Sequence, residues 1–298
     1  MNYRECYEAG QAALAEADIE EAKLDARLLL EYVCHTERNE LLVHGDREVG
    51  EEDCARYQDL IAKRAGRIPL QQLTNVQEFM GLIFHVNENV LIPRQDTEIL
   101  VEEVLRHLHD GMRVLDMCTG SGCILISLLH YSNDCSGLGV DLSDAALAVA
   151  EENAGRLLGL GDKTHKDELG NVTDAHACAS TSVLFKKSDL FEDVDGQFEI
   201  IVSNPPYIES ETIDTLMPEV RLHEPLMALD GGADGLDFYR RIVQGSKEHL
   251  AGGGMLFFEI GYNQGEAVKA LMEQSGFAEV TVVQDYAGLD RVVYGTYL

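Results

Sequence analysis

A regular alternation of strands and helices from Met112 onward constrains the fold of this chain more than any other feature of its sequence. Apolar strand-like segments recur there, and helical segments follow the first two and precede the fifth. The five segments cover residues 113–117, 137–142, 183–187, 198–204 and 255–261. Because parallel strands need crossover connections, this alternation predicts a mostly parallel, doubly wound α/β sheet. Residues 278–298 read as two strands joined by a short turn, which predicts one antiparallel strand at or near an edge.

The chain before this region has two other patterns. Residues 1–75 have apolar residues at helical spacing, and Asp18 with Glu21 has the spacing of a capping box, so we expect a small helical domain there. Residues 76–95 have strand character around a turn at 87–89 and predict a linking β-hairpin. We therefore divide the chain into a helical domain (1–75), a hairpin (76–95) and a sheet domain (96–298).

Charge and composition narrow the function classes. The 298 residues carry a net charge of −30, and no basic run is longer than two residues. A protein that binds nucleic acid mainly through phosphates needs basic surface, so no direct nucleic-acid binding is expected. No apolar run approaches the roughly 20 residues that cross a bilayer, and the start of the chain does not resemble a signal peptide, so we expect a cytoplasmic protein without membrane contact.

A polar stretch at 159–182 interrupts the alternation. Its His165, His176 and Cys178 match no standard metal spacing, and we interpret the stretch as a surface insertion rather than a metal site. The seven cysteines of the chain are scattered and contain no Cys-x-x-Cys pair. This pattern is typical of reduced thiols, so neither a disulfide nor a structural metal is expected.

Chemistry is expected where the strands end. The first strand leads into the turn Cys118, Thr119, Gly120, Ser121 and Gly122, where glycines let the backbone come close to a ligand at a helix N-terminus. Asp141 closes the second strand, where a carboxylate commonly accepts both hydroxyls of an adenosine ribose. A tight turn and a helix-capping Asp would explain the same residues without a ligand. The three-glycine dinucleotide fingerprint is absent, which disfavours NAD and FAD.

The fourth strand ends in Asn204, Pro205, Pro206 and Tyr207. This Asn-Pro-Pro-Tyr sequence resembles the signature of S-adenosylmethionine-dependent methyltransferases that act on a planar nitrogen. The Asn204 side-chain oxygen and the Pro205 carbonyl could accept the two N–H groups of an amide and hold its nitrogen toward the methyl donor. Tyr207 would stack on the planar group. An ordinary turn at the end of a strand is the alternative interpretation.

Further segments resemble one methyltransferase family. Together with Asn204 to Tyr207, residues 91–100 (LIPRQDTEIL), 220–229 and 252–265 make the chain similar to the HemK/PrmC family of protein-(glutamine-N5) methyltransferases over nearly its whole length. This resemblance implies a Rossmann-like methyltransferase sheet and S-adenosyl-L-methionine as cofactor. It also implies a substrate, the glutamine of the Gly-Gly-Gln loop of peptide-chain release factors, and hence a role in translation termination.

The same resemblance implies residue roles. Residues 118–122, Asp141 and Asn204 would contact the cofactor, and Asp189 with Leu190 would lie on its adenine side. No metal is implied. Apart from the resemblance, the acidic balance of residues 1–75 favours a domain that recognises a protein substrate over one that simply packs on its neighbour. The chain departs from the family pattern at three positions, which are Gln95 instead of proline, Cys118 instead of glycine and Leu190 instead of an aromatic residue. The alternatives are methylation of another planar nitrogen, in a ribosomal-protein glutamine or a nucleobase, a non-catalytic binding module, and a thiol enzyme using Cys118 or Cys123.

Overall fold

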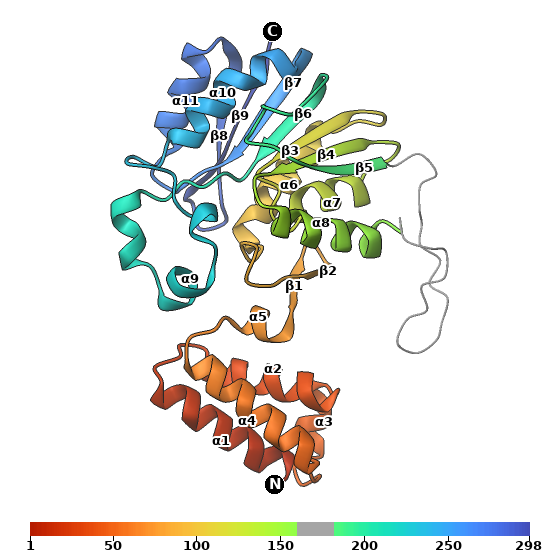
Figure 1. The fold of residues 1–298 in the computed structure, drawn as a ribbon, viewed down its shortest axis with the longest axis vertical. Coiled ribbons are helices and arrows are strands. Elements are labelled where there is room, and N and C mark those ends of the chain that lie inside the picture. The colour runs from red at the N-terminus through yellow and green to blue at the C-terminus, as the bar shows by residue number, and fades with distance from the viewer. Residues whose placement is uncertain (160–181) are drawn as a thin grey trace. The chain divides into compact units, whose positions relative to one another are not determined.

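The computed structural model describes residues 1–159 and 182–298, and the chain divides into two units. The helical unit comprises residues Met1–Val76 and Leu216–His223, and the sheet unit comprises Gln77–Thr215 and Glu224–Leu298 (Figure 1). The insertion predicted at 159–182, with its two histidines and Cys178, lies outside the described residues except for its two end positions. Among the described residues, no helix has both the length and the apolar composition that crossing a bilayer requires.

The helical unit is built on three longer helices, α1 (Tyr3–Glu16), α2 (Ala22–Cys34) and α4 (Glu51–Ala65). Three short helices complete it, namely α3 (Arg38–Val43), α5 (Leu70–Thr74) and α9 (Pro218–His223). The long helices bury one apolar face each, and the completely buried Leu14, Leu29 and Leu30 lie in their shared core. Burying each such side chain contributes roughly 1.5–3 kcal/mol, so packing holds these helices together.

The helix starts differ from the prediction in one place. The capping box expected at Asp18 is wrong, because Asp18 adopts a left-handed backbone conformation (φ 54°), and α2 begins four residues later with no cap from a described side chain. A capping box does form at the start of α1, where Asn2 and Glu5 each accept a hydrogen bond from the other's backbone N–H. Its two bonds satisfy N–H groups that the helix itself leaves free.

A two-stranded sheet follows the helical segment. Its strands β1 (Val76–Phe79) and β2 (Leu82–His85) are joined by Met80 and Gly81, both with positive φ (51° and 70°). A turn does form at 87–89, where the Val90 N–H donates to the Asn87 carbonyl at 3.4 Å, but it does not join the two strands. The hairpin turn lies at 80–81 instead, and residues 86–94 form no strand. Two consecutive positive φ angles are typical of the tightest hairpin turns, and a Met-Gly pair gives little sign of this in a sequence.

The sheet unit contains a seven-stranded sheet in the order β5-β4-β3-β6-β7-β9-β8 (Figure 1). Its strands are β3 (Arg113–Met117), β4 (Ser136–Asp141), β5 (Ser182–Lys187), β6 (Phe198–Ser203), β7 (Leu250–Glu259), β8 (Phe277–Gln284) and β9 (Asp290–Tyr297). Neighbouring strands from β5 to β7 are parallel, and β9 is antiparallel to both β7 and β8. The predicted α/β class, the mostly parallel sheet and the single antiparallel strand near an edge are confirmed.

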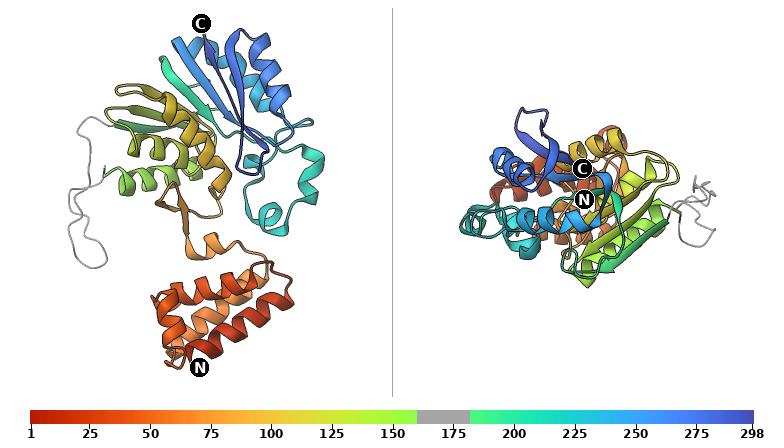
Figure 2. Two further views of the ribbon diagram at one scale, coloured as in Figure 1. Left: turned by 180° about the vertical axis from the view of Figure 1, so that it is seen from behind. Right: turned by 90° about the horizontal axis from the view of Figure 1, so that it is seen from above.

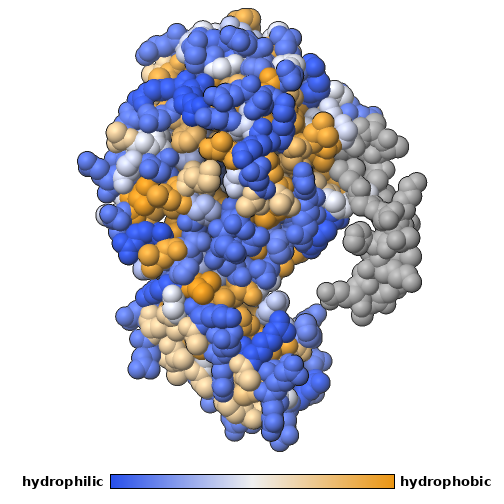
Figure 3. Space-filling view, viewed as in Figure 1, coloured by the Kyte–Doolittle hydropathy of each residue, from blue (hydrophilic) through white to orange (hydrophobic). Residues whose placement is uncertain are grey.

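Helices cover both faces of this sheet (Figure 2). They are α6 (Gln95–His107), α7 (Cys123–His130), α8 (Asp144–Leu157), α10 (Asp237–His249) and α11 (Gly265–Gln274), with short 3₁₀ helices at Ser210–Thr215 and Leu226–Ala228. The sequence patterns did not predict α11. On the outside, the face in Figure 3 is mostly hydrophilic, with separate hydrophobic patches.

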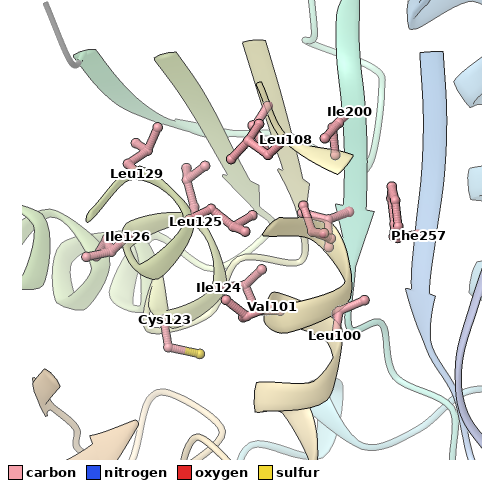
Figure 4. Packing of buried hydrophobic residues seen from close by; sticks show 14 of the residues in the cluster. Leu100, Val101, Leu108, Cys123, Ile124, Leu125, Ile126, Leu129, Ile200 and Phe257 are labelled. Carbon is pink, nitrogen blue, oxygen red and sulfur yellow. The ribbon is translucent and has the colours of Figure 1, made fainter. Parts of the chain in front are cut away.

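The core fixes where the strands end. Helix α7 is buried along nearly its whole length, and its side chains share one core cluster with side chains of α6, β6 and β7 (Figure 4). The residues labelled there include Leu100, Val101, Ile124, Leu125, Ile200 and Phe257. Strand β3 pairs with β4 on one side and β6 on the other, and Met117 lies level with Val140 and Ser203. The loops after these three strands therefore start beside one another, at the point where strand order reverses and where open α/β sheets bind ligands.

Candidate active site

A cavity of about 610 Å³ lies at the carboxyl ends of β3, β4, β5 and β6. Its size is within the range of small-molecule sites. Nine residues predicted from the sequence line it: Cys118, Thr119, Gly120, Ser121, Asp141, Asp189, Leu190, Asn204 and Pro206. Gly122, Pro205 and Tyr207, also predicted, adjoin these residues in the chain but are not part of the lining. The sheet thus brings together side chains from four separate strand ends.

The turn after β3 has an unusual backbone. Cys118, Gly120 and Gly122 all have positive φ (60°, 55° and 78°), and Gly122 caps α7. A Cβ on Gly122 would lie 2.8 Å from the Ile126 side chain, so a larger residue there would be strained both by this contact and by the positive φ. Cys118 stands where the family pattern has glycine, and glycine adopts this positive φ more easily. The cysteine side chain therefore makes the turn less favourable. The turn holds its backbone at the edge of the cavity.

Asp141 is held by backbone N–H groups on both of its oxygens. Gly120 donates to Oδ2 and Ser143 donates to Oδ1, each at 2.9 Å. Burial raises the pKa of this carboxyl, and the two backbone hydrogen bonds oppose that shift. A carboxylate fixed in this way ties the turn after β3 to the end of β4 and presents a fixed pair of acceptors to a ligand in the cavity.

A second acid, Asp116, lies beneath the turn and is completely buried. The Thr119 hydroxyl donates to its Oδ2 at 2.6 Å, and its Oδ1 has no partner among the described residues. Burial raises the pKa of Asp116 to about 7. Burial also raises the pKa of the Cys118 thiol strongly and that of Cys123 to about 12. Thiolates are therefore scarce here near neutral pH, which argues against a thiol enzyme.

Asp189 and Leu190 follow β5 and lie on the cavity wall. Leu190 is buried and has a positive φ of 53°, and its carbonyl accepts a hydrogen bond from the Ser188 hydroxyl at 2.6 Å. Asp189 forms a 2.7 Å ion pair with Arg241 of α10. The Asp189 carboxylate is thus paired with Arg241, and the apolar Leu190 side chain lines the cavity next to Asp189.

Asn204 and Tyr207 hydrogen-bond to residues of other elements. The Asn204 Nδ2 group donates to the Thr97 hydroxyl of α6 at 3.3 Å. The Tyr207 hydroxyl donates to Glu259 Oε1 at the end of β7, also at 3.3 Å. Burial raises the pKa of Glu259 to about 7, although Thr97, Arg291 and Tyr207 each act to lower it. These bonds fix the strand end that carries the Asn-Pro-Pro-Tyr sequence.

Several residues at the site were given no role from the sequence. Thr97 lines the cavity and Glu259 lies behind it, yet both fall within segments that carry the family resemblance, residues 91–100 and 252–265. Arg94 also lines the cavity and pairs at 2.5 Å with the buried Glu224, next to the lining residues 225–228. For Glu259 the available signal was an acid inside the apolar run at 255–261, whereas Thr97 and Arg94 lie in a polar stretch that does not single them out. Among the described residues, no cluster of His, Cys, Asp and Glu side chains could hold a metal.

Comparison with known proteins shows the family. The PrmC N-terminal domain matches residues 5–74, and the methyltransferase small domain matches residues 94–223. A release factor glutamine methyltransferase of Geobacter sulfurreducens is 42% identical over 95% of this chain and 92% of its own. The chain belongs to the release factor glutamine methyltransferase family. A second member, from Caulobacter vibrioides, is 40% identical over 96% of this chain and 93% of its own.

The family assignment agrees with the fold. The crystal structure of a methyltransferase from Pyrococcus furiosus superimposes with a TM-score of 0.53 over 79% of this chain and 98% of that one, at 16% identity. This likeness shows a shared fold alone. The resemblance to the HemK/PrmC family is thus confirmed, and the chain is a methyltransferase with a Rossmann-like sheet.

Proposed function

We propose that this protein transfers a methyl group from S-adenosyl-L-methionine to the side-chain amide nitrogen of the glutamine in the Gly-Gly-Gln motif of peptide-chain release factors. The observation that carries the proposal is that one cavity is lined by Asp141, by the turn at 118–121 and by Asn204. An acid suited to ribose and an amide suited to a substrate NH₂ thus face the same space. The names of the relatives supply the identity of the substrate.

The residues around the cavity fit the cofactor. We assign the ribose hydroxyls to Asp141, the methionine part to the backbone of residues 118–122, and the adenine to the side of Asp189 and Leu190. The lining is largely apolar apart from a few fixed polar groups, as adenosine sites usually are. When bound, the cofactor supplies a methyl group attached to a positively charged sulfur. This sulfur leaves readily because it becomes a neutral thioether.

The chain's own task is then to orient the nucleophile. A glutamine side-chain nitrogen is a weak nucleophile because its lone pair is delocalised into the carbonyl. The Asn204 side-chain oxygen and the Pro205 carbonyl accept its two N–H groups, which directs the lone pair toward the methyl group. The transfer would exchange the S–C bond of the methyl donor for the new N–C bond, and the nitrogen would then release one proton to water. Tyr207, whose hydroxyl is anchored on Glu259, packs against the planar amide through its ring.

We further propose that residues 1–75 recognise the release factor and that residues 96–298 carry out the transfer. The helical segment has 16 acidic and nine basic residues, so a protein is a better partner for it than a nucleic acid. The matching of residues 5–74 by the PrmC N-terminal domain supports a family-specific role for this part.

Mass spectrometry of a release factor incubated with enzyme and cofactor tests the proposal. The Gly-Gly-Gln peptide should gain the mass of one methylene group, and fragmentation should place the gain on the glutamine. Asn204→Ala should lower the rate at least about 100-fold, as loss of one aligned polar group at a reacting centre does, while cofactor affinity in calorimetry stays within a few fold. Asn133→Ala, at an exposed loop position, should leave both unchanged. An unmodified peptide with the wild-type enzyme would contradict the proposal.

A further inference from the structure

Three buried or partly buried side chains connect the end of β6 with two other elements. Thr97 lies on α6, Asn204 follows β6, and Glu259 ends β7 (Figure 1). Thr97 and Glu259 are each about 2% exposed. In the sheet, Ser203 is level with Phe258, so Asn204 and Glu259 occupy equivalent positions at the ends of neighbouring strands. The fold therefore places the Thr97 hydroxyl beside both the Asn204 amide and the Glu259 carboxylate.

The Asn204 side chain has two orientations of nearly the same shape. Its oxygen accepts hydrogen bonds and its NH₂ group donates them. In the proposed reaction the substrate amide presents N–H groups, so only an Asn204 oxygen that faces the cavity can bind it. A flipped side chain would set NH₂ against NH₂ and leave both without an acceptor, at a cost of about 1–3 kcal/mol for each buried group. The enzyme thus needs a device that selects one orientation.

We propose that Glu259 and Thr97 are positioning residues that fix the orientation of the Asn204 amide. This inference rests on the proposed function for its consequence, but the orientation itself can be measured separately. In its ionised form the Glu259 carboxylate only accepts hydrogen bonds, so we infer that the neighbouring Thr97 hydroxyl directs its single proton toward it. The Thr97 oxygen then has only lone pairs left for Asn204, and it accepts from Nδ2. The Asn204 oxygen is left for the substrate.

The surroundings of Glu259 agree with this order of donors and acceptors. The Tyr207 hydroxyl donates to Oε1, and Oε2 is buried without a hydrogen bond of standard geometry among the described residues. Thr97 lies close enough to this carboxyl to lower its pKa, which is the direction expected of a hydroxyl that faces the charged form. Arg291 favours the same form from β9, whereas Asp96 on α6 opposes it. Glu259 thus has one oxygen held by the Tyr207 hydroxyl and one buried acceptor oxygen open to a second donor.

Two substitutions at Thr97 separate its hydroxyl from its bulk. Thr97→Val keeps the shape and removes the hydroxyl, whereas Thr97→Ser keeps the hydroxyl. We expect Thr97→Val to lower kcat about 10- to 100-fold with little change in KM for cofactor, and Thr97→Ser to retain most of the wild-type kcat. Thr281→Val, exposed on β8, is the matched control and should have no effect. Equal losses in Thr97→Val and Thr97→Ser, or no loss in Thr97→Val, would overturn the proposal.

The double substitution tests whether the residues act together. Glu259→Gln can donate as well as accept, so it no longer dictates the direction of the Thr97 proton. We expect Glu259→Gln alone to lower kcat. Glu259→Gln combined with Thr97→Val should be no slower than Thr97→Val alone, because both substitutions remove the same interaction and their effects therefore do not add. Losses that multiply would mean that the two side chains act independently, against the proposal.

Nuclear magnetic resonance tests the orientation without any substrate. In enzyme labelled with ¹⁵N-asparagine, the Asn204 side-chain signal is assigned by its loss in Asn204→Ala. Its hydrogens should exchange slowly in the wild type and clearly faster in Thr97→Val. An Asn204 signal that is the same in both would overturn the positioning role even if release factors are methylated. Faster exchange in Thr97→Val combined with an unmodified release factor would overturn the proposed substrate and support the network.

Discussion

At the scale of single residues, the site keeps two acids away from water. Asp116 lies beneath the turn after β3, and Glu259 ends the strand next to Asn204. Burial raises the pKa of each carboxyl to about 7. An acid whose pKa is higher in the folded state than in the unfolded chain binds more protons when folded. Stability therefore falls as pH rises between the two pKa values and is constant above the higher one. The site thus carries an electrostatic cost at neutral pH.

Asp116→Asn makes this cost measurable. The wild-type chain should lose stability relative to the variant as pH rises from about 4 to about 7, by at most about 1.4 kcal/mol per pH unit and on the order of 4 kcal/mol in all. Above pH 7 the difference should stay constant. Urea unfolding of both proteins at a series of pH values checks this, because every other titrating group cancels in the difference. A difference that does not change with pH would mean that Asp116 titrates normally.

At the scale of elements, the segment before α10 supports the Asn-Pro-Pro-Tyr strand end. Ile208 and Asp230 form a parallel bridge, and the Gly231 N–H donates to the Ile208 carbonyl at 2.8 Å. A Cβ on Gly231 would lie 2.6 Å from the Tyr207 Cα and 2.8 Å from the Pro206 carbonyl oxygen. Here the need for glycine comes from close packing of two backbones rather than from a left-handed φ.

Gly231→Ala should therefore push the strand end away from its position. We expect a loss of about 1–3 kcal/mol of stability, as overpacking usually costs, and a fall in kcat of at least about 10-fold, because residues 204–207 move. Gly252→Ala is the matched control, since a Cβ there meets no described atom within 4 Å. Thermal unfolding and the methylation assay on both variants check the expectation. Equal activity in the two variants would show that the loop tolerates the shift.

The elements also show what a sequence can predict. The strands of the sheet are apolar runs that end sharply, so the α/β class and the gathering of Cys118, Asp141 and Asn204 at one edge could be foreseen. The Met80–Gly81 turn could not, because Met80 adopts a positive φ that its side chain does not favour. Nor could the role of Thr97, because its partner lies 107 positions away and the bond depends on how α6 packs against the sheet.

At the scale of the whole molecule, the chain passes between its two units more than once. Helix α9 lies far along the chain, yet it belongs to the helical unit, where Glu219 accepts hydrogen bonds from Arg64 at 3.1 Å and Arg67 at 3.2 Å. Arg64 also pairs with the buried Asp25 at 2.7 Å. Burial alone would raise the pKa of Glu219, but hydrogen bonds from its own backbone, Arg67 and Arg64 outweigh this and lower it. The helical unit is thus completed by a segment that follows β6 in the chain.

Glu219→Gln tests whether this completion matters for substrate recognition. The neutral amide has one acceptor oxygen and leaves two arginines short of negative charge, so we expect the helical unit to lose about 3–5 kcal/mol, as removal of one partner of a buried ion pair does. If the helical unit presents the release factor, KM for the release factor should rise several fold. Cofactor affinity should stay unchanged, because no described residue of the helical unit lines the cavity.

The matched control for this variant is Glu211→Gln, which makes the same change of charge at an exposed position. It should alter neither the unfolding midpoint nor KM. Steady-state kinetics with the full-length release factor, compared with a short Gly-Gly-Gln peptide, then locates the effect. A helical unit that recognises the folded partner predicts a loss with the full-length factor and none with the peptide, since a peptide that reaches only the cavity makes no use of α9. A similar rise in KM for both would instead mean that Glu219 acts on the cavity itself.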